Sequence, residues 1–195
     1  MNQSRYAVVL AAGTGQRFRA LAGPDQDKLL APCKGLDGQL RPVLEQVLRT
    51  LCPMTAHCLV VTRHDTPQRT ALAHAYGCQV VLIDSAGMGD SLAAAVRACP
   101  DADGWLVVLG DMPYIEGGTY RTLLEGISES RIRVPLGQRG RGHPVGFGRV
   151  FAQDLQALEG DQGGKRLLTV ENVDEIAIDD PGIYQDVDQP GDLLI

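Results

Sequence analysis

The sequence lacks any long apolar run. Across its 195 residues, no apolar segment reaches the roughly 20 residues that a membrane-spanning helix needs, so no membrane partner is expected. The opening stretch MNQSRYAVVLAAG also lacks the basic start and the long apolar centre of a signal peptide. These absences predict a cytoplasmic protein.

Basic residues are also scarce. The chain has 18 lysines and arginines against 24 aspartates and glutamates, which gives a formal charge of −6. A broad basic surface is what holds a nucleic-acid backbone, so no nucleic-acid partner is expected.

The cysteines lack the spacing of a disulfide framework or a zinc site. There are five, an odd number, and no two of them form a CxxC pair. Free and mostly buried thiols in a reducing cytosol are expected, and zinc is not. The cysteines are Cys33, Cys52, Cys58, Cys78 and Cys99.

The sequence does contain apolar segments that alternate with amphipathic ones. Strands are predicted at 5–12, 57–62, 78–83, 104–110 and 131–134, and helices at 42–51, 66–76, 90–99 and 119–126. Two further short strands are predicted at 174–180 and 183–190. Strand–helix repetition predicts parallel strands with helices on both faces, so the expected fold class is a three-layer α/β/α sandwich with a mainly parallel, Rossmann-like sheet. With 44% hydrophobic residues and no Pro/Ser-rich linker, residues 1–195 are expected to form a single domain.

The first predicted strand runs into the glycine-containing segment LAAGTGQRF. Backbone N–H groups around Gly13 and Gly15 can face phosphate oxygens, because no side chain stands in the way. A dinucleotide fingerprint requires a third glycine where Phe18 stands, and the acidic residue that should end its second strand is also missing. Arg17 and Lys28 supply cations for a triphosphate, although an ordinary strand–helix turn with two solvated cations is the alternative.

Carboxylates follow two of the predicted strands. Asp111 comes directly after 104–110, and Asp188 lies in the predicted strand 183–190, with Asp186 as a competing choice. Magnesium prefers one or two such carboxylates together with substrate phosphates, so Asp111 and Asp188 are the predicted Mg²⁺ ligands. A turn or helix-cap role is the alternative for either aspartate.

The glycine segment and the DKLL that follows it resemble the opening signature of the nucleotidyltransferases with a Rossmann-like fold. Five more segments match in the same order: GMGDSL, GDMP, GHPVGF, GDQGGKR and DVDQPGDL. Within that class the sequence is most similar to the molybdenum-cofactor nucleotidyltransferases, in particular the molybdopterin cytidylyltransferase-like group. The resemblance covers nearly the whole chain and implies a sheet of the nucleotide-diphospho-sugar transferase type.

This resemblance implies a Mg²⁺-dependent enzyme that moves a nucleoside monophosphate from an NTP, with CTP favoured, to a phosphate acceptor and releases pyrophosphate. The implied acceptor is molybdopterin or its metal-loaded form, with a molybdoenzyme as a further partner. The implied catalytic residues are Arg17 and Lys28, and the metal ligands are Asp111 and Asp188. The implied nucleotide contacts are Leu10, Ala11, Ala12, Gly13, Gly15, Gly87 and Ser91, and the acceptor contacts are His143, Asp161 and Gly163.

The sequence also departs from the family pattern. Arg19 occupies the place of a common glycine, the segment before Lys28 is longer, and Gln189 stands where threonine is usual. These changes leave open GTP as donor, and phospholactate or a sugar phosphate as acceptor. Two other classes of protein also remain open: a dinucleotide-dependent oxidoreductase and a non-catalytic protein that delivers a cofactor.

Overall fold

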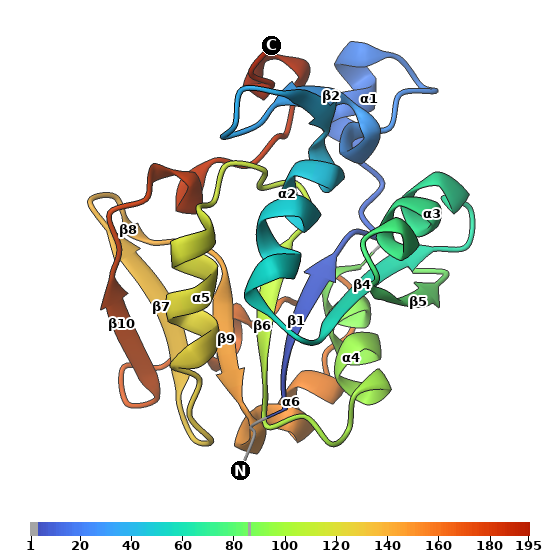
Figure 1. Cartoon of the computed structure of the whole chain (residues 1–195). Helices are drawn as coiled ribbons and strands as arrows, with labels where there is room; N and C mark the ends of the chain where they lie inside the picture. Colours follow the sequence, from blue (N-terminus) through green and yellow to red (C-terminus); the bar gives the residue numbers. More distant parts are fainter. Residues whose placement is uncertain (1–3, 86) are drawn as a thin grey trace.

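A computed structural model describes residues 4–85 and 87–195 as a twisted central sheet with helices on both faces (Figure 1). Residues 1–3, which begin the stretch predicted not to be a signal peptide, lie outside the described part. The strand order is β10-β7-β9-β6-β1-β4-β5, with β8 paired to β7. The strands are β1 Arg5–Leu10, β4 Cys58–Arg63, β5 Gln79–Ile83, β6 Gly104–Leu109, β7 Ile132–Gly137, β8 Gly140–Arg141, β9 Val145–Gly148 and β10 Val173–Ala177.

The pairing confirms a mainly parallel sheet. β1 pairs in parallel with β4 and β6, β4 with β5, and β7 with β10. β9 runs antiparallel between β6 and β7, and β8 is antiparallel to β7. The sequence did not predict β9, because it has only four residues and two of them are glycines, which are depleted in strands.

The two faces of the sheet bury alternate residues of each strand, as the period of two requires. On β1, Ala7 and Val9 belong to one core, which packs under α2 (Val43–Leu51), α3 (Pro67–Ala75) and α5 (Gly117–Glu125). Val8 belongs to the opposite core, which packs under α4 (Met88–Ala98) and α6 (Ala152–Gln156). The result is the expected three-layer α/β/α sandwich.

Helix ends follow the local sequence. Thr66 and Pro67 begin α3, and Gly77 adopts a φ of 72° just beyond its end, a left-handed conformation that favours glycine. Short elements that were not predicted are α1 (Gln16–Ala22) and the two-stranded sheet of β2 (Pro32–Lys34) and β3 (Leu40–Pro42). Within the described ranges, no helix is long and apolar enough to cross a membrane.

The predicted strand at 183–190 is wrong. This segment instead contains two 3₁₀ turns, Pro181–Tyr184 and Pro190–Asp192, joined by an irregular stretch. Proline supplies no backbone donor for a strand ladder, and the Asp192 carboxylate accepts from the N–H groups of Asp188 and Gln189. The shorter strand predicted at 174–180 is present as β10.

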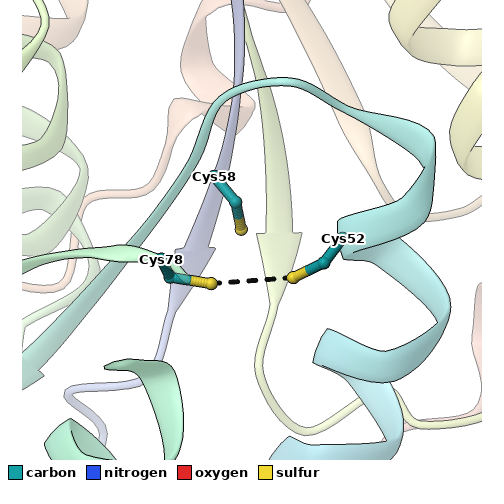
Figure 2. Close-up of side chains that lie close together, drawn as sticks. All are labelled: Cys52, Cys58 and Cys78. Atoms are coloured by element: carbon teal, nitrogen blue, oxygen red, sulfur yellow. Dashed lines mark hydrogen bonds between the residues drawn. The ribbon is translucent and has the colours of Figure 1, made fainter. Parts of the chain in front are cut away.

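The five cysteines are free thiols. Cys33, Cys78 and Cys99 are buried, whereas Cys52 and Cys58 are partly exposed. Three of them lie together beneath α2, which their sequence spacing did not suggest (Figure 2).

Candidate active site

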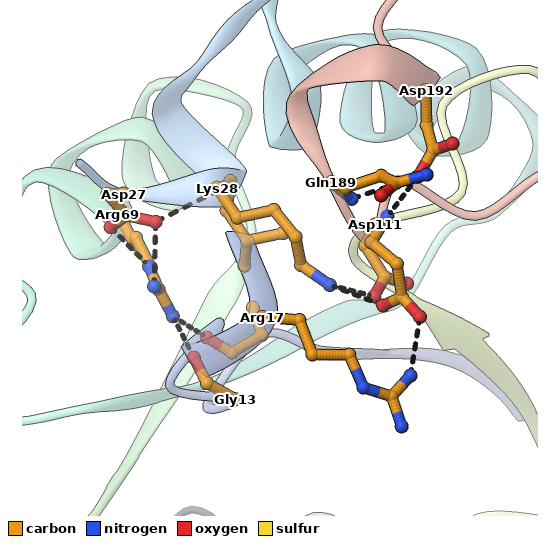
Figure 3. A network of polar contacts seen from close by, with 11 residues as sticks. Gly13, Arg17, Asp27, Lys28, Arg69, Asp111, Gln189 and Asp192 are labelled. Carbon is orange, nitrogen blue, oxygen red and sulfur yellow. Dashed lines mark hydrogen bonds and ion pairs between the residues drawn. The ribbon is translucent and has the colours of Figure 1, made fainter. Parts of the chain in front are cut away.

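The glycine segment leaves the carboxyl end of β1 and is held in place by the buried guanidinium of Arg69, from α3 (Figure 3). Arg69 Nη1 donates to the carbonyl oxygens of Ala11 (2.6 Å) and Gly13 (3.1 Å). Its Nε and Nη2 each lie 2.7 Å from a carboxylate oxygen of Asp27. Asp27 also accepts from the N–H of Leu29, so one ion pair joins the glycine segment to the turn that carries Lys28.

Gly15 shapes the start of α1. Its φ of 63° and ψ of 36° lie in the left-handed region, which most other residues enter at a cost. A Cβ at Gly15 would stand 3.3 Å from the Cβ of Lys28. The glycine therefore provides both the turn and the space that Lys28 occupies.

Four predicted charged residues meet beside this turn. Lys28 Nζ lies 2.7 Å from Asp111 Oδ2 and 3.5 Å from Asp188 Oδ1, and Arg17 Nη1 lies 2.8 Å from Asp188 Oδ2 (Figure 3). The Lys28 and Asp111 side chains are 12% and 23% exposed, whereas Arg17 is 84% exposed. Lys28 is thus a largely buried cation between two carboxylates, and Arg17 is an exposed one at the rim.

Asp188 reaches this cluster from the irregular C-terminal segment. The N–H of Val187 donates to the carbonyl of Asp111 at 2.9 Å, which fixes the two aspartates side by side. Asp192 closes the turn beyond, and hydrogen bonds from the Gln189 and Asp188 N–H groups hold the pKa of its carboxyl below the usual value. Asp186, the competing metal ligand, makes no ion pair among the residues that the structure describes.

Two cavities flank the charged cluster. One, of about 420 Å³, is lined by Gly13, Thr14, Gly15, Gln16, Arg17, Phe18, Lys28, Asp161 and Asp188. The other, of about 570 Å³, contains all three predicted acceptor contacts, His143, Asp161 and Gly163. Asp161 lines both, so the two cavities are neighbours.

The larger cavity has an apolar floor and a cationic border. Its apolar lining residues are Leu10, Met88, Leu92, Val107, Leu109, Val134, Val145, Phe147 and Leu168. Arg141 and Lys165 supply positive charge at its edge, and Arg141 Nε lies 2.7 Å from Glu175. This combination suits a ligand with an apolar body and an anionic group.

His143 lies at the wall of that cavity. Burial lowers its pKa, and this effect outweighs the opposing influence of the Asp111 and Asp186 carboxylates. Its Nδ1 is buried and has no hydrogen-bond partner within the described part of the chain.

The structure gives Gly87 and Ser91 a different task from the nucleotide contact predicted for them. The Ser91 side chain is buried, and its hydroxyl donates to the Gly87 carbonyl at 2.8 Å. A Cβ at Gly87 would stand 2.4 Å from the carbonyl oxygen of Gly160, and the N–H of Gly89 donates to that same oxygen at 2.7 Å. These residues fasten α4 to the loop that carries Asp161, and their contact with a nucleotide stays a prediction.

The other predicted nucleotide contacts are near but unequally placed. Gly13 and Gly15 line the smaller cavity and Leu10 lines the larger one. Ala11 and Ala12 are almost fully buried, and the N–H and carbonyl of Ala11 already bond to Val61 and Arg69, so the contacts predicted for these two residues stay predictions. Sequence reasoning missed Arg69, Asp27 and Asp192, which hold the predicted residues in place.

The carboxyl edge of a mainly parallel sheet, a glycine turn and paired carboxylates define a nucleotide-binding α/β protein. A family model, the MobA-like NTP transferase domain, matches residues 7–176. The chain belongs to the MobA-like NTP transferase family. This family match does not distinguish the narrower molybdenum-cofactor group that the motifs suggest.

Solved structures share this fold over almost the whole chain. The structure of Rv0371c from Mycobacterium tuberculosis H37Rv has a TM-score of 0.81 and 27% identity, and the match covers 98% of this chain and 96% of that one. A homologue from Mycobacterium sp. strain JC1 has a TM-score of 0.77 and 30% identity, covering 97% and 93% of the two chains. A nucleotidyl transferase from Methanothermobacter, at 24% identity and a TM-score of 0.80 over 98% and 94% of the chains, supports the fold alone.

Curated relatives are longer proteins. The bifunctional protein GlmU of Halorhodospira halophila is 35% identical over 159 residues, which are 77% of this chain and 29% of that protein. The GlmU of Clavibacter sepedonicus is 29% identical over 188 residues, which are 91% of this chain and 35% of that protein. The chain thus spans about a third of the length of the curated relatives it matches.

Proposed function

We propose that this protein is a Mg²⁺-dependent nucleotidyltransferase that moves a nucleoside monophosphate from an NTP, with CTP as the preferred donor, to a phosphate monoester. The observation that carries the proposal is the convergence of Asp111 and Asp188 on Lys28, next to the glycine turn and its cavity. These groups match what nucleotidyl transfer requires: a place for the triphosphate, cations for its charge and hard oxygens for a divalent ion.

The donor set at the cluster fits Mg²⁺. Asp111 and Asp188 present carboxylate oxygens to a common point, where Lys28 Nζ lies 2.7 and 3.5 Å from them. Mg²⁺ prefers few carboxylates together with phosphate oxygens, and when bound it offsets negative charge on the triphosphate. A mycobacterial protein of this fold is described as a complex with manganese, another hard divalent ion (TM-score 0.74, 24% identity).

In the proposed reaction an oxygen of the acceptor phosphate attacks the α-phosphorus of the NTP. A new P–O bond forms as the bond to the β-phosphate breaks, and pyrophosphate leaves with the electron pair. The acceptor phosphate is already anionic near neutral pH, so positioning and charge compensation matter more than a general base. Backbone N–H groups from Ala12 to Gly15 would hold the triphosphate, while Lys28 and Arg17 would compensate its charge.

The acceptor is assigned to the larger cavity. Its apolar floor favours a body with an apolar or planar surface, and His143, Arg141 and Lys165 favour an attached phosphate. Molybdopterin or its metal-loaded form has this character and is the proposed acceptor, with a molybdoenzyme as later recipient. A sugar phosphate or phospholactate is the alternative acceptor, and GTP the alternative donor.

Pyrophosphate release tests the proposal. CTP, GTP, UTP and ATP are each incubated with molybdopterin or a sugar phosphate, in Mg²⁺, Mn²⁺ or EDTA. Release that requires both substrates and a divalent ion supports the proposal, and Asp111→Asn should lower it at least a hundredfold. Asp65→Asn is the matched control, because in the described part of the chain Asp65 pairs with Arg63 at an exposed position.

The same preparation distinguishes the other classes of function. Thermal stabilisation by NADPH without any nucleoside triphosphate would favour an oxidoreductase and overturn the proposal. Binding of NTP and acceptor with no pyrophosphate release would favour a non-catalytic delivery protein.

A further inference from the structure

Three thiols meet at the edge of the sheet opposite the carboxylates (Figure 2). Cys52 begins the 3₁₀ turn after α2, Cys58 is the first residue of β4, and Cys78 directly precedes β5. Because β4 and β5 are parallel neighbours, their amino ends bring Cys58 and Cys78 together, and the turn after α2 places Cys52 beside them. All three sulfur atoms lie within 4.8 Å of one another.

The spacing of the sulfurs is that of metal ligands. Cys52 Sγ and Cys78 Sγ lie 3.6 Å apart. A disulfide bond would place them about 2.05 Å apart. Thiolates that share one metal ion at about 2.3 Å lie roughly 3.8 Å from each other around a tetrahedral ion and roughly 4.0 Å around a three-coordinate one. The observed distance is therefore close to the separation of two sulfurs on a common ion.

We propose that Cys52, Cys58 and Cys78 form a binding site for a soft, thiophilic d¹⁰ metal cation, with three-coordinate Cu⁺ as its preferred ion. The donor set consists of sulfur alone, and soft sulfur ligands select Cu⁺ or Zn²⁺ over Mg²⁺. Structural zinc sites have four protein ligands. Over residues 4–85 and 87–195 no histidine, aspartate or glutamate joins these three sulfurs, so Cu⁺, which accepts three ligands, fits the set better.

The three thiols differ in how readily they lose a proton. Hydrogen bonds from Cys58 and Cys78 lower the pKa of the Cys52 thiol, whereas the same contact with Cys52 raises the pKa of Cys58 and of Cys78. Tyr120 is fully buried on α5, and its hydroxyl has no hydrogen-bond partner in the described part of the chain. Burial raises the pKa of Tyr120, and the negative charge of Asp180 raises it further, so the phenol keeps its proton.

Binding requires no redox change. Three Cu–S bonds form, the protons of the thiols that are still protonated go to solvent, and copper remains Cu⁺ throughout. The site is also independent of the proposed function. β4 has six residues, so its two ends lie about 20 Å apart, and the thiols are at the amino end.

The test is an anaerobic titration of the full chain, reduced beforehand, with Cu⁺ held by bathocuproine disulfonate. Wild type should withdraw one Cu⁺ per chain and develop ultraviolet thiolate-to-Cu⁺ charge-transfer absorption. Cys58→Ala and Cys78→Ser should each weaken Cu⁺ binding at least tenfold. The matched control is Cys33→Ala, which removes a buried thiol outside the cluster and should bind Cu⁺ as wild type does.

Circular dichroism and urea unfolding of each variant show whether the chain is folded, independently of metal. A parallel titration with Zn²⁺ tests the choice of ion: tighter one-to-one binding of Zn²⁺ would overturn the Cu⁺ assignment. The site itself is overturned by substoichiometric Cu⁺ binding, or by folded Cys58→Ala and Cys78→Ser variants that bind like wild type. A disulfide bond between Cys52 and Cys78 that forms under these anaerobic conditions, detected by mass spectrometry as the loss of two hydrogens, would also overturn the site.

Discussion

Replacing Arg69 by alanine removes the ion pair that holds the glycine segment to the turn before Lys28. The Arg69 side chain is 5% exposed and Asp27 is 22% exposed, so this pair is largely shielded from water. The substitution removes the Arg69 donor from the carbonyls of Ala11 and Gly13, so Ala11 keeps only the longer hydrogen bond from the Thr62 hydroxyl (3.4 Å). Asp27 keeps the hydrogen bond from the N–H of Leu29.

The expected magnitude follows from these contacts. Breaking a buried ion pair by removing one partner costs about 3–5 kcal/mol, and each hydrogen bond to a charged group contributes about 1.5–3 kcal/mol. Asp27 is partly accessible, so water can replace some of what it loses. We therefore expect Arg69→Ala to lower the free energy of unfolding by about 3 kcal/mol, near the lower end of that range.

Urea unfolding of the single and double variants measures this cost. A double-mutant cycle with Asp27→Ala should give a coupling energy above about 1.5 kcal/mol, because the two side chains share two hydrogen bonds. Arg69→Ala should also raise the KM for the NTP more than it lowers kcat, since the glycine segment loses its support.

The control is Arg63→Ala, which removes a similar two-bond pair with Asp65 at an exposed position. Exposed pairs contribute about 0–1 kcal/mol, so this variant should change stability little. A loss below 1 kcal/mol for Arg69→Ala, or strict additivity with Asp27→Ala, would refute the assigned role.

Three other predictions concern the site and its supports. A Cβ at Gly89 would stand 2.6 Å from the Gln162 carbonyl oxygen, so Gly89→Ala should cost about 1–3 kcal/mol in urea unfolding, whereas Gly118→Ala, with open space around it, should cost nothing. Equal effects of the two would contradict this. Burial lowers the pKa of His143 despite two nearby carboxylates, so the folded chain binds its proton less readily than the unfolded chain does. The free energy of unfolding should therefore fall as the pH drops below about 6.5, by at most about 1.4 kcal/mol per pH unit. His143→Gln should flatten this part of the pH profile. An unchanged slope in that variant would exclude His143 as the cause. Lys28→Met leaves the carboxylates of Asp111 and Asp188 facing each other without the ammonium group between them. The melting temperature of this variant should therefore rise more with added Mg²⁺ than that of wild type. An equal rise would argue against an ion site shared by the two carboxylates.

Much of the fold could be predicted from local patterns. The alternation on β1 that sends Val8 and Val9 to opposite cores is visible in the sequence, and the helix starting at Pro67 carries its own boundary signals. β9 could not be found this way, because its strand character comes from pairing on both sides and not from its residues. Residues 183–190 have the alternating pattern of a strand, which is why a strand was predicted there. The Asp192 carboxylate accepts hydrogen bonds from the N–H groups of Asp188 and Gln189, and these bonds hold the end of the segment in a turn.

The charged cluster was predictable because its residues lie in motifs. Arg17, Lys28, Asp111 and Asp188 were singled out in the sequence, and the structure brings them together. Arg69 lies in no motif and pairs with a residue 42 positions away, so only tertiary structure reveals it.

The thiol cluster had one usable signal in the sequence. Cys58 and Cys78 stand at the beginnings of two predicted strands, and parallel neighbours place such beginnings side by side. The neighbouring order of those strands, and the approach of Cys52 from α2, could not be read from spacing.

Asp161 borders both cavities, and its loop is fastened to α4 through Gly160. An anion entering either cavity changes the electrostatic field that the other ligand meets, so the two occupancies are energetically linked. Such linkage is reciprocal: the factor by which one ligand alters the affinity of the second is the factor by which the second alters that of the first. The carboxylate of Asp161 repels an anion in either cavity, and two anionic ligands also repel each other. A divalent cation bound between them would reduce this repulsion and so tighten the binding of both ligands.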